Sequence, residues 1–176
     1  MPYRLGPTLI TASEIQARIQ ELATAISRDY AGRELLLICV LKGAAVFWAD
    51  LCRGLRIPCQ SDFVAMESYG KATSPLAEPR FTKAADVALA DRDILIVEDI
   101  VDTGHTLSYL LEMLAARHPA SLKTCALVTK PSRREREVPI EYVGFEIPDE
   151  WVVGYGLDYK DHYRTLPYIG VIQPDE

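Results

Sequence analysis

Uninterrupted apolar segments of strand length recur along this chain, and they restrict the folds that it can adopt. Residues 35–40 (LLLICV) are the clearest example, and residues 93–98 and 122–129 have a similar character. Strands that are apolar on both faces are typical of parallel sheets, because helices cover both sides of such a sheet. The segments near 43–55 and 106–117 carry apolar residues at helical spacing. The sequence therefore predicts an α/β fold with a mainly parallel central sheet.

Other segments complete this expected domain. Thr11 and Glu14 have the spacing of a capping box, which predicts that a helix starts there. Residues 60–66 are expected to form a strand. Further short strands are expected at 141–147, 151–156 and 168–172. The chain of 176 residues shows no interdomain linker, so we expect one domain over residues 1–176.

Charge and composition exclude several classes of protein. The formal net charge of −6 argues against a general nucleic-acid binder, and no apolar run approaches the length of a membrane span. The N-terminus has no basic region followed by a long apolar stretch, so no signal peptide is expected. The four cysteines show no CxxC spacing and favour free thiols in a reducing compartment. We therefore expect a cytoplasmic protein.

The segment ILIVEDIVDTGHTL, residues 94–107, ends a predicted strand with three acidic residues, Glu98, Asp99 and Asp102. Like charges this close repel one another unless a cation or hydroxyl groups lie among them. Gly104 allows a tight turn into the next helix, whose free N–H groups and dipole favour an anion such as phosphate. Neither GxGxxG nor a Walker A loop is present. An alternative is that Asp102 caps the helix and the acids are solvated.

A phosphate site beside two acids predicts a ligand with a phosphate and adjacent hydroxyls, as in a ribose phosphate. The segment 97–107 (VEDIVDTGHTL) resembles the binding signature for phosphoribosyl diphosphate (PRPP) of type I phosphoribosyltransferases. The similarity continues through residues 41–43, 68–69, 130–132 and 147–172. Residues 147–172 resemble the corresponding segment of the purine enzymes and not that of their pyrimidine relatives. The chain thus resembles the hypoxanthine (6-oxopurine) branch of the family.

This resemblance implies a fold, a reaction and partners. The fold is the type I phosphoribosyltransferase fold, in which a small hood would form from the N-terminal residues and from about 148–176. A mobile loop would span about 67–83. The reaction is transfer of ribose 5-phosphate from PRPP to N9 of hypoxanthine or guanine, with Mg²⁺ as cofactor. Products would be IMP or GMP and pyrophosphate. Homodimers or homotetramers are common among such enzymes; no nucleic-acid or membrane partner is implied.

The resemblance also assigns roles to residues around PRPP. The residues implied for PRPP and phosphate binding are Lys42, Gly43, Glu98, Asp99, Asp102, Thr103, Gly104, His105, Thr106 and Arg164. Glu98 and Asp99 would hold the ribose hydroxyls near one magnesium ion, and Asp158 would bind a second. Asp102 would act as general base or acid at N7 of the purine. The peptide bond before Lys42 is expected to be cis. The His105 side chain departs from some relatives and is expected to face solvent.

A second group of residues is implied for the purine and for the loop. Lys130 would donate to the exocyclic O6, Trp151 would stack on the ring, and Val152 would offer backbone groups to the base edge. Ser68 and Tyr69 would lie near pyrophosphate when the loop closes. Considered alone, Lys130 is compatible with a surface lysine, Trp151 with a core residue and Asp158 with a turn residue. The basic residues that follow Lys130 are expected to be solvated: Arg133, Arg134 and Arg136.

Two alternatives remain at this stage. The first is a phosphoribosyltransferase that prefers xanthine or guanine, because the contacts near C2 of the purine are not ranked by the sequence. The second is a regulatory RNA-binding protein that has kept the PRPP-binding fold, or a nucleotide sensor. The net charge of −6 and the purine-type segment around Trp151 argue against the RNA-binding protein.

Overall fold

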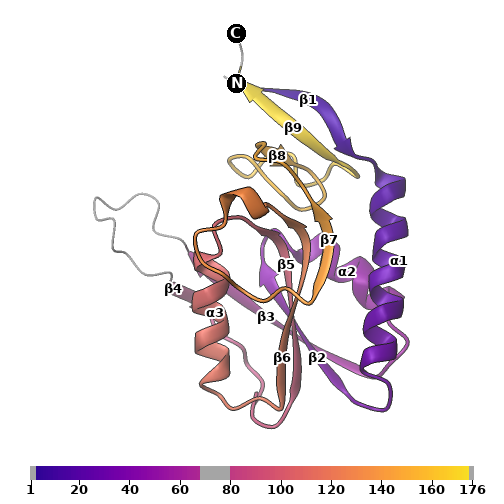
Figure 1. Cartoon of the computed structure of the whole chain (residues 1–176), viewed down its shortest axis with the longest axis vertical. Helices are drawn as coiled ribbons and strands as arrows, with labels where there is room; N and C mark the ends of the chain where they lie inside the picture. Colours follow the sequence, from indigo (N-terminus) through magenta and orange to yellow (C-terminus); the bar gives the residue numbers. More distant parts are fainter. Residues whose placement is uncertain (1–2, 68–79, 175–176) are drawn as a thin grey trace.

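The computed structural model describes residues 3–67 and 80–174, which form two β-sheets and three α-helices (Figure 1). The larger sheet has the spatial order β4 (Arg80–Lys83), β3 (Cys59–Glu67), β2 (Leu35–Leu41), β5 (Asp93–Val101), β6 (Ser121–Thr129) and β7 (Tyr142–Glu146). The smaller sheet has the order β1 (Tyr3–Ile10), β9 (Ile169–Pro174) and β8 (Val152–Val153). The helices are α1 (Ala12–Asp29), α2 (Ala45–Gly54) and α3 (His105–Ala115).

Parallel pairing dominates the larger sheet. β2 pairs with β3 and β5, β5 pairs with β6, and β6 pairs with β7, all in parallel, while β4 runs antiparallel to β3. Residues 35–40 and 94–97 are buried, as their apolar character on both faces requires. The prediction of an α/β fold with a mainly parallel central sheet is confirmed.

Helices cover both faces of the larger sheet (Figure 1). α1 and α2 lie on one face, where Phe47 and Leu51 of α2 are fully buried in the same cluster as Leu37 of β2. α3 lies on the opposite face, where Leu107 and Leu110 pack in a second cluster. The amphipathic pattern of each helix therefore accounts for the side of the sheet that it covers.

The first helix begins where its capping box predicts. The Thr11 side chain accepts a hydrogen bond from the Glu14 N–H at 3.3 Å, and the Thr11 N–H donates to the Glu14 carboxylate at 2.8 Å. The helix buries an apolar stripe at helical spacing, made of Ile15, Ile19, Leu22, Ala23 and Ile26. This stripe holds α1 against α2 and the sheet.

The smaller sheet, called the terminal sheet below, joins the two ends of the chain. β9 pairs with β1 on one side and with β8 on the other, in both cases antiparallel. β1 was not expected from the sequence. Its register shifts between Leu5 and Thr8, where Gly6 and Pro7 lie, and these two residue types are unfavourable inside a strand. The local sequence does not predict a strand here, and the hydrogen bonds to β9 stabilise it.

The polar segment expected as a loop over 67–83 is partly strand. Glu67 belongs to β3, and residues 80–83 form β4, which pairs back onto β3. Tertiary pairing thus overrides the polar composition of residues 80–83. The rest of that segment, with Ser68 and Tyr69, lies outside the described residues. Among the described helices, none has the length and apolar character needed to cross a membrane.

The topology directs attention to one edge of the larger sheet. The chain leaves β2 for β3 on one side, and it leaves β5 for β6 on the other, although β2 and β5 are neighbours. In open parallel sheets, such a reversal opens a crevice at the carboxyl ends of the two strands, and ligands bind there. The segments at this position are 41–43 and 98–106.

Candidate functional site

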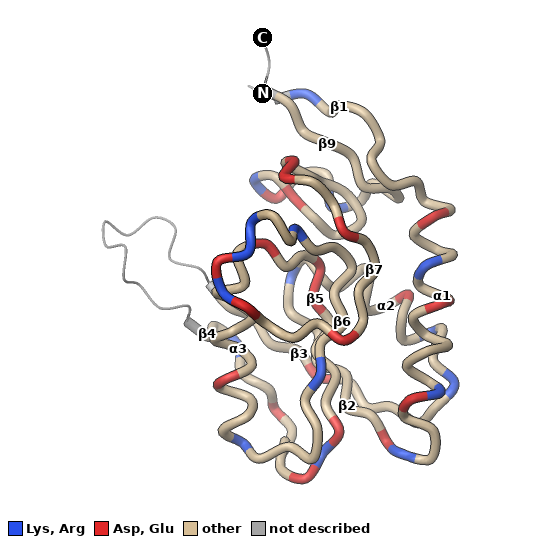
Figure 2. Tube along the Cα trace, in the orientation of Figure 1, with Lys and Arg blue, Asp and Glu red and all other residues tan. Residues whose placement is uncertain are grey.

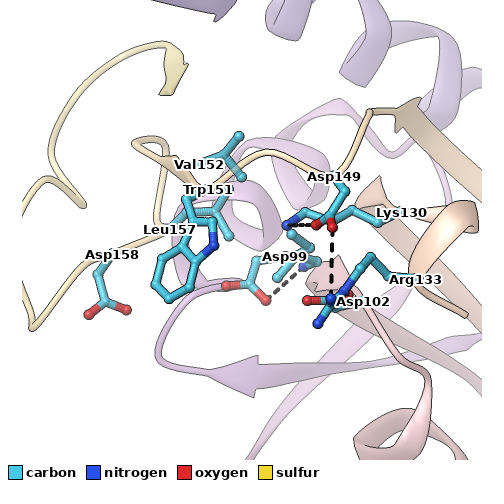
Figure 3. Close-up of a pocket in the computed structure, with 10 residues that line it drawn as sticks. Asp99, Asp102, Lys130, Arg133, Asp149, Trp151, Val152, Leu157 and Asp158 are labelled. Atoms are coloured by element: carbon cyan, nitrogen blue, oxygen red, sulfur yellow. Dashed lines mark hydrogen bonds and ion pairs between the residues drawn. The ribbon is translucent and has the colours of Figure 1, made fainter. Parts of the chain in front are cut away.

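Two adjoining pockets lie at the carboxyl ends of these strands. The larger pocket has a volume of about 430 Å³ and is lined by Asp99, Ile100, Asp102, Lys130, Arg133, Asp149, Trp151, Val152, Leu157 and Asp158 (Figure 3). The smaller pocket has a volume of about 100 Å³ and is lined by Glu98, Ile100, Val101, Asp102, Thr103, Gly104, Thr106 and Leu107. Ile100 and Asp102 line both pockets, so a ligand with two recognition elements can occupy them together.

The smaller pocket is built around the N-terminus of α3. Gly104 precedes the helix with a φ of 89°, and no side chain caps the helix. The first turn also contains no acidic residue. The initial N–H groups of a helix have no partner within it, and the helix dipole adds positive potential there. This pocket therefore favours an anion, as the sequence predicts for residues 102–106.

The loop that follows β6 packs against the smaller pocket and carries both basic and acidic residues (Figure 2). The N–H groups of Glu135 and Arg136 both donate to the Thr103 carbonyl at 3.0 Å. A Cβ on Gly104 would overlap the Arg136 carbonyl, so the close approach requires glycine. His105 Nε2 lies 2.9 Å from a Glu135 carboxylate oxygen. The imidazole is exposed, as expected, and this contact pairs it with a residue 30 positions away in sequence.

Glu98 and Asp99 lie in the last third of β5, which ends at Val101, and Glu98 lines the smaller pocket while Asp99 lines the larger one. Burial, together with the charge of Asp99, raises the pKa of Glu98 well above its usual range. Burial also raises the pKa of Asp99, whose carboxylate accepts the Ile100 N–H at 2.8 Å. Glu98 Oε2 is buried and has no hydrogen-bond partner in the described part of the chain. An unpartnered carboxylate oxygen here is poised to accept from a hydroxyl or to face a cation.

The raised pKa of Glu98 predicts a pH-dependent stability. The folded protein binds more protons at this site than the unfolded chain, so the free energy of unfolding falls as the pH rises above the usual value of 4.5. In the absence of divalent ions, Glu98→Gln should therefore become more stable relative to wild type with increasing pH, by up to about 1.4 kcal/mol per pH unit. Urea unfolding between pH 5 and 8 measures this difference.

The control for this measurement is Glu112→Gln, because Glu112 is exposed on α3. Its stability relative to wild type should not follow the same trend. A Glu98→Gln variant whose advantage does not grow with pH would contradict the raised pKa of this buried carboxyl.

The segment after β2 packs directly against Asp99. The Leu41–Lys42 peptide bond is cis, as expected. A Cβ on Gly43 would overlap the Asp99 carboxylate, and a Cβ on Gly156 would overlap the Gly43 carbonyl. Three segments far apart in sequence thus meet here without room for a methyl group.

This packing predicts a stability difference between two glycine variants. Gly156 has a φ of 100° and no space for Cβ, whereas Gly32 has a φ of 78° and no atom within 4 Å of the added Cβ. Gly32→Ala therefore tests backbone strain alone, about 1–2 kcal/mol. Gly156→Ala adds the overlap and should lose about 3 kcal/mol or more in urea unfolding. Equal losses in the two variants would show that the approach to Gly43 does not constrain the fold.

Basic residues and acids alternate beside this segment. Lys42 Nζ lies 3.6 Å from Asp161, and Arg164 contacts Asp161 at 3.1 Å and Asp158 at 2.7 Å. Arg164 also donates to the Gly156 carbonyl at 2.8 Å, which fixes its guanidinium. Asp158 additionally accepts the Asp161 N–H at 2.7 Å, so it both stabilises the turn and lines the larger pocket. The sequence did not identify Asp161.

The opposite wall of the larger pocket carries a second set of charges (Figure 3). Lys130 is buried, with its Nζ 3.8 Å from Asp149, and so is not a surface lysine. Arg133 contacts Asp102 at 3.3 Å and Asp149 at 3.7 Å. Arg133 and Asp149 are site residues that the sequence missed, since Arg133 was expected in a solvated loop. A basic residue three positions after Lys130 is the signal that could have identified Arg133.

The neighbouring basic residues also differ from expectation in one case. Arg134 donates to the Thr129 hydroxyl at 2.6 Å and is partly buried, so it is not a solvated surface residue. Arg136 is exposed, as expected. The tertiary contact between this loop and residues 102–104 explains why Arg134 is drawn inward.

Trp151 is an exposed aromatic residue over the larger pocket. The residue is 65% exposed and meets the Tyr159 ring edge-on at a centroid distance of 6.3 Å. In Figure 3 its indole lies between Asp158 on one side and the group of Lys130 and Asp149 on the other. A large apolar ring held open beside a pocket suits stacking against a planar ligand, whereas a core role is excluded.

Carboxylates in and beside the two pockets are the available ligands for a metal ion. Within residues 3–67 and 80–174, no three His, Cys, Asp or Glu side chains are grouped as a metal site. Mg²⁺ commonly uses one or two carboxylates and completes its shell with water and substrate phosphates. The unpartnered Glu98 oxygen beside Asp99 fits such a partial site. The Asp158 carboxylate, which lines the larger pocket, is also compatible with such a partial site.

The structure brings almost all of the sequence-predicted residues to this one edge of the sheet. They are Lys42, Gly43, Glu98, Asp99, Asp102, Thr103, Gly104, His105, Thr106, Lys130, Trp151, Val152, Asp158 and Arg164. The predicted loop residues Ser68 and Tyr69 lie outside the described residues.

Comparison with known proteins agrees with this arrangement. Residues 10–160 match the model of the phosphoribosyl transferase domain. A hypoxanthine-guanine phosphoribosyltransferase from Mycobacterium avium is 49% identical, covering 98% of this chain and 88% of that protein. A hypoxanthine phosphoribosyltransferase from Escherichia coli is 47% identical, with 96% of both chains covered. The crystal structure of a Bacillus anthracis hypoxanthine-guanine phosphoribosyltransferase has a TM-score of 0.91 at 39% identity, covering 97% of this chain and 99% of that one.

Proposed function

This chain belongs to the phosphoribosyltransferase family, and we propose on that premise that it transfers ribose 5-phosphate from PRPP to N9 of hypoxanthine or guanine. The products are IMP or GMP and pyrophosphate, which makes the protein a pentosyltransferase of purine salvage. The observation that supports this reaction most strongly is the shared wall of the two pockets. An anion site and a planar-ligand site meet at Asp102, as the two ends of a nucleotide require.

PRPP would be held by the segments after β2 and β5. The N-terminus of α3 and the hydroxyls of Thr103 and Thr106 would receive the 5′-phosphate in the smaller pocket. Glu98 and Asp99 would accept hydrogen bonds from the ribose hydroxyls. The pyrophosphate would lie beside the backbone of Lys42 and Gly43, near the Arg164 guanidinium.

Enzymes of this family generally depend on Mg²⁺, and the donor set here is compatible with it. Glu98 and Asp99 would contribute oxygens on one side of the ribose, and Asp158 would do so on the other, in part through water. When bound, the ion offsets the negative charge of the departing pyrophosphate. The raised pKa values of Glu98 and Asp99 imply that a cation binds more tightly as these groups lose their protons.

The purine would occupy the larger pocket. Trp151 would stack on the ring, and the backbone of Val152 would contact the base edge. Lys130, a buried cation, would donate to the exocyclic O6. Adenine carries an amino group in place of that oxygen and cannot accept from the ammonium, which is a strong basis for rejection.

Asp102 would move the proton at N7 of the purine. Its carboxylate lines both pockets, so it lies where the base and the ribose approach each other. As N9 bonds to C1 of the ribose, the base must lose a proton, and Asp102 is the acceptor within reach. The remaining residues orient the reactants and stabilise charge.

The terminal sheet, with the segment from about 148 to 176, would form the hood over the base. Whether the protein forms a homodimer or homotetramer stays a prediction. The four cysteines are free thiols, which favours a reducing compartment such as the cytoplasm.

A product assay tests the proposed reaction. Purified protein with PRPP, Mg²⁺ and hypoxanthine should form IMP and pyrophosphate in equal amounts, as separated by chromatography. Chelation of divalent ions should abolish product formation, and restoring Mg²⁺ should recover it. Absence of IMP with hypoxanthine, and of GMP with guanine, would overturn the proposal.

A further inference from the structure

Four side chains of alternating charge follow one another along a wall of the larger pocket (Figure 3). Asp102 Oδ1 lies 3.3 Å from Arg133 Nε, and Arg133 Nη1 lies 3.7 Å from Asp149 Oδ2. Asp149 Oδ1 in turn lies 3.8 Å from Lys130 Nζ. We call this series the charge chain. Its formal charge sums to zero, so these four side chains leave no net charge along this wall.

The two ends and the two middle members of the charge chain differ in role. The ends, Asp102 and Lys130, are the groups that contact the purine in the proposed function. The middle members, Arg133 and Asp149, line the same pocket without a contact to the purine in that function. Each of them nevertheless divides its interactions between one end and the other middle member. The side chain of Lys130 is only 7% exposed, so its contact with Asp149 is the least screened by water.

We propose that Arg133 and Asp149 are positioning residues that exchange partners when the base binds. In the structure, Arg133 contacts Asp102 and Asp149 contacts Lys130. When a purine offers N7–H to Asp102 and O6 to Lys130, these two ends turn to the ligand. Arg133 and Asp149 then pair fully with each other, and Lys130 and Asp102 each keep a hydrogen-bond partner on the ligand. This inference rests on the proposed function and concerns the recognition of the base.

The exchange makes the two contacts with the base depend on each other. A ligand that binds only Asp102 or only Lys130 removes one of the two ion pairs of the adjoining middle residue. In a partly buried site the loss of that ion pair costs free energy. A ligand with an acceptor at C6 and a proton at N7 satisfies both ends at once. The charge chain therefore adds to discrimination in favour of 6-oxopurines beyond the single contact of Lys130.

Neutralising one middle residue should impair base binding in a defined way. In Arg133→Gln, Asp149 has Lys130 as its remaining cation and competes with O6 for it. In Asp149→Asn, Arg133 has Asp102 as its remaining anion and competes with N7–H. Each single variant should raise the KM for hypoxanthine about tenfold, the scale of coupled charges in contact. The KM for PRPP should stay near the wild-type value.

The double variant separates this inference from a merely structural role. Arg133→Gln combined with Asp149→Asn removes both competitors and leaves Lys130 and Asp102 free for the ligand. Its KM for hypoxanthine should therefore be lower than that of either single variant, within about threefold of wild type. Independent structural roles would multiply the two losses to about a hundredfold.

Controls and outcomes complete the experiment. Arg136→Gln removes the same charge from an exposed position in the same loop and should leave the KM for hypoxanthine unchanged. Thermal melting confirms that each variant is folded. A double variant whose KM equals or exceeds that of the worse single variant would overturn the exchange, as would single variants without effect. A wild-type protein without turnover would instead overturn the proposed function itself.

Discussion

Replacing Asp102 with asparagine should lower the turnover number with hypoxanthine by about 10² or more, the scale of general acid–base catalysis. Asparagine has nearly the same shape and keeps the wall between the two pockets. It cannot accept the N7 proton, so the loss should appear in kcat. The phosphate-binding N–H groups at the start of α3 are unchanged, and the KM for PRPP should change little.

Steady-state kinetics with both substrates varied measures this effect. Asp86→Asn is the matched control, because Asp86 is exposed near β4 and pairs with Lys83, away from either pocket. The control should keep wild-type kinetics. Unchanged turnover in Asp102→Asn would remove Asp102 from the mechanism, whereas a loss confined to the KM for PRPP would reassign it to binding.

Lys130→Met should lower kcat/KM for hypoxanthine by about 10² or more, because a charged donor to the exocyclic oxygen is lost from a buried position. Methionine fills similar space without a donor. Adenine has no oxygen that accepts from this donor, so the activity with adenine should fall by a smaller factor than the activity with hypoxanthine. The ratio of hypoxanthine to adenine activity should therefore shrink.

The same strand provides a control for the Lys130 variant. Lys123 lies earlier in β6, where its Nζ sits over the Tyr30 ring at 5.4 Å from the centroid, and it lines neither pocket. Lys123→Met should leave the ratio of the two activities unchanged. If Lys130→Met also preserved that ratio, the O6 contact would have to come from another group.

The fold could be predicted from the sequence where local patterns and tertiary packing agree. The apolar run of β2 is buried on both faces, and the run of β5 ends where its acids meet the pockets. The capping box of Thr11 lies at the start of α1. The anion site was predicted from the glycine turn that joins β5 to α3, because the free N–H groups at a helix N-terminus bind anions.

The remainder depends on contacts between distant segments. β1 and β4 have weak strand sequences and form by pairing with β9 and β3, which a local pattern does not reveal. Arg133 belongs to the site because the loop after β6 folds back over residues 102–104, and Asp149 belongs to it because the segment after β7 brings its carboxylate to Arg133 and Lys130. A charged side chain in a polar loop has the same local signature whether it faces water or a pocket.

A base panel is the measurement that tests the central claim most directly. Wild-type protein with PRPP and Mg²⁺ would be supplied in turn with hypoxanthine, guanine, xanthine, adenine and uracil, and nucleotide formation followed by absorbance. The site predicts rapid turnover with hypoxanthine or guanine, and a preference over adenine of about 10⁴. No turnover with any base despite PRPP binding, or equal rates with adenine, would contradict the account.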